Sequence, residues 1–298
     1  MNVTLTGATG FIGSRLIERL RAEGHELRVL TRSPRQAQPG IRYFEWDAIG
    51  QPVPAESIDG GNAVIHLAGE PVFQRWSPEA KQRIRDSRVN GTRRLVEALS
   101  TASPRPEVLV SASAIGYYGD RGDQVLNEGS RPGKGFLPEV SVEWEKAAEL
   151  AEALGIRVVR LRIGIVLGRG GGALKQMLTP FRMGVGGRLG SGKQWMSWVH
   201  LDDLIGLIIF AAGNRASSGP INGTAPEPVR NADFTRTLAR TLHRPAVLSV
   251  PRFGLRLLFG EFGSSLTESQ RVLPKAAESA GYRFVFPKLD GALEDLLR

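Results

Sequence analysis

The sequence predicts an α/β protein built on a doubly wound parallel sheet, with a smaller, mostly helical C-terminal lobe. Three observations support this prediction. Apolar runs of strand length recur between amphipathic segments with helical spacing, as in sheets whose strands are joined by helices. One run, 62–69, is apolar almost throughout, as expected of a central strand covered on both faces. A glycine-rich turn joins the first strand to the first helix.

The predicted elements follow in order along the chain. Strands are expected at 2–6, 26–31, 42–47, 62–69, 108–113, 156–168 and 220–224. Helices are expected after residue 10 and at 77–99, 137–154, 204–212, 231–242 and 289–297. We predict that His66, on the fourth strand, is a core histidine with satisfied hydrogen bonds. His200 and Asp202 are expected to cap a helix and to join the two lobes.

The turn after the first strand carries three glycines, each three residues from the next. Without a Cβ, glycine takes positive φ and lets a phosphate approach the main chain, while the N–H groups of a new helix attract an anion. Gly13 is expected to let the helix lie close to the strand. A purely structural turn is the alternative, but its position between strand and helix favours nucleotide binding. The candidate binding residues here are Gly7, Thr9, Gly10, Phe11 and Ile12.

Composition limits the classes of function. The chain has 298 residues, of which 41% are hydrophobic, so it is long enough to bury a full core. It has no cysteine, which excludes disulfides and thiolate chemistry. It lacks a basic, apolar N-terminal leader and any apolar run of the roughly 20 residues that span a membrane. A cytoplasmic protein without a membrane partner is therefore expected.

The net charge of +9 raises the question of an anionic partner such as nucleic acid. The arginines are scattered over nearly every segment, and the chain lacks a basic motif interleaved with aromatic residues. An arginine-rich solvated surface is therefore favoured over nucleic-acid binding. A small-molecule substrate is the expected partner, and the chain is expected to be a monomer or a homodimer.

The end of the second strand predicts the cofactor. About 20 residues after the glycine turn, NAD-binding folds place an acid on the ribose 2′-hydroxyl. Here the strand ends in Thr31, Arg32 and Ser33. A guanidinium holds a 2′-phosphate that an acid would repel, so this position predicts NADP, with Arg35 as a second contact. A surface arginine at a strand end is the alternative.

Several motifs together resemble one enzyme superfamily. The G-x-x-G-x-x-G spacing, the strand end Leu67-Ala68-Gly69 and the stretch 111–119 are similar to the extended short-chain dehydrogenase/reductases. The stretches 195–203, 222–229 and 271–275 resemble its atypical, uncharacterised "epimerase family" branch, which carries a C-terminal domain of unknown function. The resemblance implies a Rossmann-type fold, with 1–164 plus 196–226 binding the cofactor and 165–195 plus 227–298 forming the substrate lobe.

The resemblance also implies further cofactor contacts. An acid after the third strand commonly binds the adenine amino group, and Asp47 is the candidate. A lysine in the helix after the fifth strand binds the nicotinamide ribose, and Lys146 matches it. The other candidate cofactor residues lie at the ends of the fourth, fifth and sixth strands, namely Leu67, Ala68, Gly69, Glu70, Ser111 and Arg162.

The catalytic pattern of the superfamily is incomplete in this chain. A serine at the end of the fifth strand orients the substrate, and Ser113 matches it better than Ser111. The acid is normally a tyrosine four residues before the lysine, but Val142 stands there. Tyr117 and Tyr118, in the loop after the fifth strand, are the candidate replacements, and Glu145 is a weaker candidate base.

The predicted function is that of an NADP(H)-binding, epimerase/dehydratase-like oxidoreductase acting on a small polar substrate in the crevice between the lobes. The sequence shows no metal-ligand cluster. The missing tyrosine favours an alternative, a non-catalytic NADP(H)-binding sensor or scaffold. Glycines between 168 and 192 are expected to make the segment over the crevice flexible, as in a lid or a structural loop.

Overall fold

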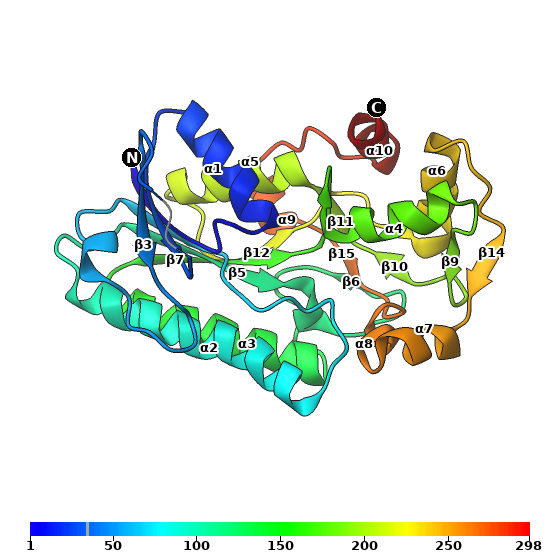
Figure 1. Cartoon of the computed structure of the whole chain (residues 1–298), viewed down its shortest axis with the longest axis horizontal. Coiled ribbons are helices and arrows are strands. Elements are labelled where there is room, and N and C mark those ends of the chain that lie inside the picture. Colours follow the sequence, from blue (N-terminus) through cyan, green and yellow to red (C-terminus); the bar gives the residue numbers. More distant parts are fainter. Residues whose placement is uncertain (34–35) are drawn as a thin grey trace.

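The computed structural model describes residues 1–33 and 36–298 and is organised around one seven-stranded, fully parallel sheet (Figure 1). From one edge to the other, its strands are β12 (Gly219–Gly223), β7 (Arg157–Ile163), β5 (Val108–Ala114), β4 (Ala63–His66), β1 (Asn2–Thr6), β2 (Glu26–Thr31) and β3 (Ile41–Glu45). The chain runs outward from β1 through β2 to β3, then returns to the other side of β1 with β4. Such a reversal leaves a crevice at the carboxyl ends of the strands, where ligands bind in open α/β sheets. The predicted fold is confirmed.

Helices cover both faces of this sheet (Figure 1). On one face, α1 (Phe11–Ala22) and α5 (Leu201–Gly213) pack on the apolar residues of β1 and β2, with α9 (Lys275–Ser279) near β12. On the other face, α2 (Pro78–Thr101) and α3 (Phe136–Glu149) lie side by side. Burial on both faces explains why the central strands are continuously apolar.

The C-terminal region is mostly helical and adds small sheets beside the main one. Its helices are α4 (Gly172–Arg182), α6 (Asn231–Thr241), α7 (Arg252–Phe259), α8 (Phe262–Ser265) and α10 (Leu289–Leu297). Its two-stranded sheets pair β8 (Ile165–Gly168) with β11 (Trp198–His200), β9 (Gly187–Leu189) with β14 (Leu248–Val250), β10 (Trp195–Met196) with β13 (Val229–Arg230), and β6 (Val125–Leu126) with β15 (Arg271–Val272). In the part of the chain that the structure describes, there are also three 3-10 helices: η1 (Ala55–Ser57), η2 (Ile115–Tyr118) and η3 (Leu150–Leu154).

The two regions are fastened together at the start of α5. The imidazole of His200 accepts a hydrogen bond from the backbone N–H of Asp202 and stacks on Phe286 at 4.0 Å between ring centroids. The next carboxylate, Asp203, accepts the backbone N–H groups of Val285 and Phe286 at 2.7 and 2.9 Å. His200 is therefore the expected cap and interlobe contact. Asp202 forms an ion pair with Arg15 of α1.

The glycine-rich segment after β8 packs on the ring of Phe11. A Cβ at Gly168 would lie 2.7 Å from this ring, and one at Gly172 would lie 2.6 Å from it. Gly172 also has a φ of +62°, which side chains rarely adopt. Glycine is thus required here by close approach of the backbone to the first turn of α1.

Among the described residues, no helix is long and apolar enough to cross a bilayer.

His66 links β1, β4 and α2 in the core. Its ring is fully buried and is hydrogen-bonded to the hydroxyls of Thr6 at 2.6 Å and Thr92 at 2.9 Å. Burial lowers the pKa of His66 from 6.5 to about 4, with a smaller contribution from the charge of Arg88. The neutral ring is therefore a structural link, as the sequence predicts.

This pKa shift predicts a pH-dependent loss of stability. Below pH 6.5 the unfolded chain takes up a proton on His66, whereas the folded chain stays neutral down to about pH 4. This group should therefore lower the free energy of unfolding by about 2 kcal/mol between pH 7 and pH 5. Urea unfolding of the wild type and of His66→Gln at both pH values measures it. Equal pH dependence in the two proteins would contradict the assignment.

Candidate functional site

The glycine turn forms a shallow cradle at the carboxyl end of β1. Gly7 has a φ of +67°, and a Cβ there would lie 2.5 Å from the carbonyl carbon of Leu67. Thr9 and Gly10 are exposed, and Gly10 precedes α1 without a side-chain cap, so the first N–H groups of the helix are left for a ligand. Phe11 and Ile12, in the first turn, are half-buried. A side chain at Gly7 would collide with the backbone of Leu67, so glycine lets the turn lie close to the end of β4. The uncapped N–H groups at the start of α1 suit the phosphates of a dinucleotide.

The neighbouring strand ends supply the residues expected at the adenosine end. Arg32 and Ser33 are exposed directly after β2. Asp47 lies after β3, where its carboxylate accepts the backbone N–H of Ile49 at 3.2 Å. Arg35, the predicted second contact, lies outside the described residues.

The residues after β4 border the crevice and meet a basic side chain from α2. Leu67, Ala68 and Glu70 are half-buried, and Gly69 is exposed. A Cβ at Gly69 would lie 3.1 Å from the guanidinium carbon of Arg88. Nη1 of Arg88 donates to the carbonyl oxygens of Glu70 and Ile84, and its guanidinium lies 5.1 Å from the ring centroid of Trp144. Burial lowers the pKa of Arg88 to about 10, so this residue remains a cation at neutral pH.

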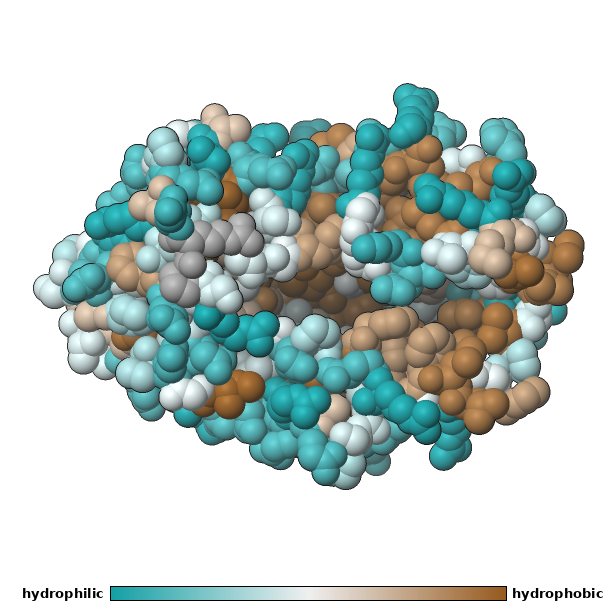
Figure 2. All heavy atoms as spheres, in the orientation of Figure 1, coloured by the Kyte–Doolittle hydropathy of each residue, from teal (hydrophilic) through white to brown (hydrophobic). Residues whose placement is uncertain are grey.

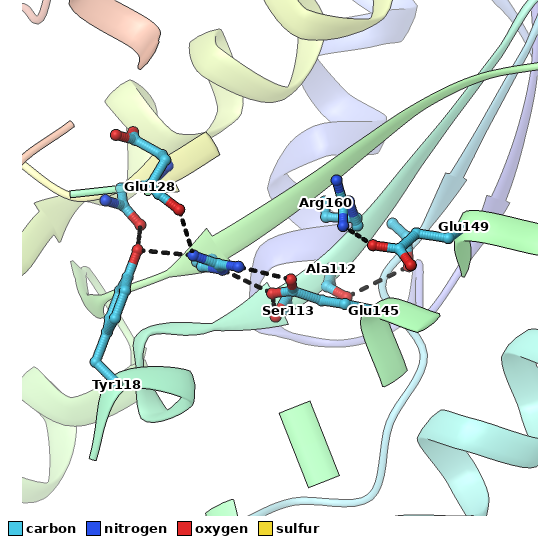
Figure 3. A network of polar contacts seen from close by, with 10 residues as sticks. Ala112, Ser113, Tyr118, Glu128, Glu145, Glu149 and Arg160 are labelled. Atoms are coloured by element: carbon cyan, nitrogen blue, oxygen red, sulfur yellow. Dashed lines mark hydrogen bonds and ion pairs between the residues drawn. The ribbon is translucent and has the colours of Figure 1, made fainter. Parts of the chain in front are cut away.

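A buried ion pair lies between β5, β7 and α3 (Figure 3). Arg162 holds Glu145 with two hydrogen bonds, from Nε to Oε1 at 2.7 Å and from Nη2 to Oε2 at 2.8 Å. The hydroxyl of Ser113 donates to Oε1 of Glu145 at 2.6 Å. The three residues are buried. Burial by itself would lower the pKa of Arg162, but the hydrogen bonds and charge of Glu145 outweigh burial and raise this pKa above its usual value, so Arg162 is a cation.

The same guanidinium extends this network to Tyr118. Nη1 of Arg162 donates to the Tyr118 hydroxyl at 3.0 Å, and this hydroxyl donates to the side-chain oxygen of Asn222 at 2.7 Å. Burial raises the pKa of Tyr118 to about 12. Tyr118 is fully buried, so it is a poor candidate for exchanging a proton with a substrate. Its prediction as an acid is corrected to a structural link.

Tyr117 differs from its neighbour. It is half-buried, and the guanidinium of Arg162 lies 3.6 Å from the centroid of its ring. Among the residues that the structure describes, its hydroxyl makes no hydrogen bond, and it therefore remains the better tyrosine candidate.

Burial on α3 and β7 distinguishes two predicted cofactor contacts: Arg162 is corrected, whereas Lys146 stays a prediction. Lys146 is exposed, whereas Glu145, one residue earlier, faces the sheet. Residues four apart share a helix face, so the buried pair at this position is Ser141 and Glu145 rather than Val142 and Lys146. Arg162 is 3% exposed and is held by Glu145, which leaves it behind the crevice as a support. Ser111 is 1% exposed, deeper in β5 than Ser113.

A cavity of about 650 Å³ lies between the carboxyl ends of the sheet strands and the C-terminal helices. It is lined by Ala114 and Ile163, the last residues of β5 and β7, and on α3 by Ser141 and Trp144. Figure 2 shows a hollow in this face of the molecule with apolar residues gathered beside it. Most of the lining side chains are aliphatic or aromatic, which does not fit the small polar substrate that the sequence predicts.

Nine lining residues have polar or charged side chains, and the sequence analysis assigned none of them to the site. Arg88 and Glu268 are the two that can carry a charge, and Ser141 lies one helical turn before Glu145. Arg88 is one of several arginines in a basic helix, and only packing shows which one faces the crevice. Burial and the charge of Asp120 raise the pKa of Glu268 to about 7. For Ser141 the sequence held one signal: it stands four residues before Glu145, the same interval that separates the tyrosine and lysine of the superfamily.

This geometry agrees with the family match. The NAD dependent epimerase/dehydratase family matches residues 3–222, and a domain of unknown function, DUF1731, matches residues 250–296. The chain belongs to the NAD dependent epimerase/dehydratase family. It therefore has an epimerase/dehydratase-like, NAD(P)-binding fold. The resemblance to an atypical branch with its own C-terminal domain is confirmed.

Relatives of this family match the whole chain. An Arabidopsis thaliana protein, the chloroplastic homologue of epimerase family protein SDR39U1, is 45% identical over 100% of this chain and 87% of its own length. The crystal structure of human SDR39U1 (isoform2) with NADPH is 34% identical, with a TM-score of 0.90 and 99% of each chain covered. The UDP-glucuronic acid 4-epimerase from Bacillus cereus, solved with UDP-glucuronic acid and NAD, is 18% identical, with a TM-score of 0.81 and 99% and 98% covered. At this identity the last comparison shows the fold alone.

The hydrogen bonds of Tyr118 predict that removing its hydroxyl lowers the stability of the fold and leaves cofactor affinity unchanged. Tyr118→Phe removes the hydroxyl between Arg162 and Asn222, which should lower the free energy of unfolding by about 1–2 kcal/mol. NADPH affinity should stay unchanged. Chemical denaturation and calorimetry measure these quantities, with Tyr117→Phe as the matched control for stability. A loss of stability in Tyr117→Phe as large as in Tyr118→Phe would contradict the assignment.

Proposed function

We propose that this protein is an NADP(H)-dependent oxidoreductase or epimerase of an atypical kind, acting on a small molecule bound in the cavity. The observation that carries the proposal is the position of Arg88. This side chain lies against Gly69 in the cofactor crevice and also lines the cavity. Cofactor and substrate would therefore meet beside one fixed positive charge.

The residues of the crevice suit a phosphorylated nicotinamide dinucleotide. Gly7, Gly10 and the N-terminus of α1 would hold its diphosphate, and Arg32 with Ser33 would hold the ribose 2′-phosphate. Leu67, Ala68 and Gly69 would line the crevice after β4. Human SDR39U1, which is 34% identical, was solved with NADPH, and this supports the choice of NADP. When bound, the cofactor supplies or accepts a hydride.

The protein's own groups would handle the charge and the proton on the substrate oxygen. Arg88 is a half-buried cation, and such a charge stabilises a developing oxyanion in an apolar surrounding. We propose that Tyr117 of η2, just after β5, delivers the proton, since its hydroxyl makes no hydrogen bond among the described residues. Tyr117 does not line the cavity, so this role requires η2 to move toward the bound molecule. The Glu145–Arg162 pair would position this loop, and Ser113 would fix the carboxylate.

A non-catalytic NADP(H)-binding role is the second candidate. It is favoured by the hydrogen bond from Ser113 to Glu145, which directs the serine proton away from any substrate. Under this proposal, cofactor binding would change how the lobes interact with a partner, without turnover.

The cofactor choice predicts a selective loss of affinity. Arg32→Asp should weaken NADPH binding roughly 10- to 100-fold more than NADH binding, since it removes charge-assisted bonds and adds repulsion. Calorimetry with both cofactors measures this difference. Arg42→Asp, which makes the same change at an exposed site near the start of β3, should leave the ratio unchanged. Equal losses for the two cofactors in Arg32→Asp would defeat the 2′-phosphate assignment.

The role of Tyr117 predicts a loss of chemistry. In single-turnover oxidation of bound NADPH with a panel of aldehydes and ketones, Tyr117→Phe should lower the rate roughly 100-fold or more. Tyr118→Phe, which removes a neighbouring hydroxyl from the buried network, should cause a smaller loss. Tight NADPH binding with no oxidation by any member of the panel would favour the non-catalytic role.

A further inference from the structure

The cavity walls differ from those of a site for a charged substrate. Of the described side chains that line it, only Arg88 and Glu268 are ionisable. Seven others are polar but uncharged, such as Gln176 and Gln270, and the rest are aliphatic, aromatic or glycine, with the apolar ones in the majority. A buried charge without partners costs several kcal/mol, so a ligand must match this lining in polarity.

A nucleotide diphosphate fits this lining poorly. Its two phosphates would need several cations or N–H donors. Nη1 of Arg88 already donates to two backbone carbonyl oxygens, so this residue has fewer donors left for phosphate. Glu268 would add a negative charge whenever it is ionised. The arginines that flank Trp195, Arg230 and Arg271, stack on its ring at 4.3 and 4.4 Å and do not line the cavity.

We infer that the cavity takes an uncharged, predominantly apolar molecule whose single carbonyl or hydroxyl oxygen lies beside Arg88. This inference rests on the proposed function, because it names the substrate class of the same site. The apolar body would gain from burial against the cavity walls, while the oxygen would meet the one cation at the cofactor end.

The entrance to the cavity supports the same ligand class. Leu258 of α7 lines the cavity and is 66% exposed, so the apolar wall continues out to the surface. Val185 and Phe73 likewise line the cavity and are exposed. An apolar molecule would thus enter across an apolar rim and would not pass a charged barrier.

The neighbouring Leu257 provides a matched control. It is 76% exposed on the same helix but does not line the cavity. Leu258→Glu and Leu257→Glu make the same change one residue apart, at positions where a charged side chain can be solvated. Both variants should fold.

The test uses the full chain loaded with NADPH and a neutral fluorescent probe, phenylnaphthylamine. Primary alcohols from butanol to octanol should displace the probe, with affinity rising roughly fourfold for each added methylene. UDP-glucose should not displace it. Leu258→Glu should weaken probe binding roughly tenfold, while Leu257→Glu should bind as the wild type does.

Displacement by UDP-glucose, or an affinity that does not rise with chain length, would overturn the inference. Equal weakening in the two variants would also overturn it, because the probe would then report the exposed face of α7. These readouts need no turnover. Titration of the same samples with NADPH tests the proposed function separately, so failure of one is distinguishable from failure of the other.

Discussion

The ion pair between Glu145 and Arg162 is the interaction on which the site depends. It joins α3 to β7, and through Ser113 and Tyr118 it also ties β5 and the loop that follows β5. Removing one partner of such a pair would leave an unpaired buried charge, at a cost of about 3–5 kcal/mol. This pair therefore holds the carboxyl ends of β5 and β7, the η2 turn and α3 in one arrangement beside the crevice.

The pair also explains how the fold departs from the usual chemistry of its superfamily. The buried cation comes from β7 and α3 contributes the buried anion, while the lysine of α3, Lys146, is exposed. The positive charge that reaches the cavity comes instead from Arg88 on α2, which is stacked on Trp144. The cavity beside Arg88 has mostly apolar walls.

The crevice and the cavity place two kinds of environment side by side. Around the glycine turn, backbone N–H groups and Arg32 face solvent and suit phosphates. Beyond Gly69 the walls become apolar, and a charge there acts more strongly because little water screens it. Such a gradient allows one end of the site to bind a charged cofactor while the other takes an apolar molecule.

The sequence by itself determined the sheet, the cofactor turn and the second-strand arginine, because these depend on local patterns: strand periodicity, glycine spacing and the sign of one charge. It also showed that Val142 stands where the tyrosine is expected, while the role of Ser113 in orienting a substrate stays a prediction. It placed Arg162 at the cofactor, whereas this side chain of β7 is buried against Glu145. It also did not show that Glu145 faces the sheet, because sequence spacing does not set the rotation of α3. Only the tertiary structure decided that Glu145 pairs with Arg162, that Arg88 reaches the crevice, and that distant apolar segments enclose one cavity, because these contacts join residues far apart in the chain.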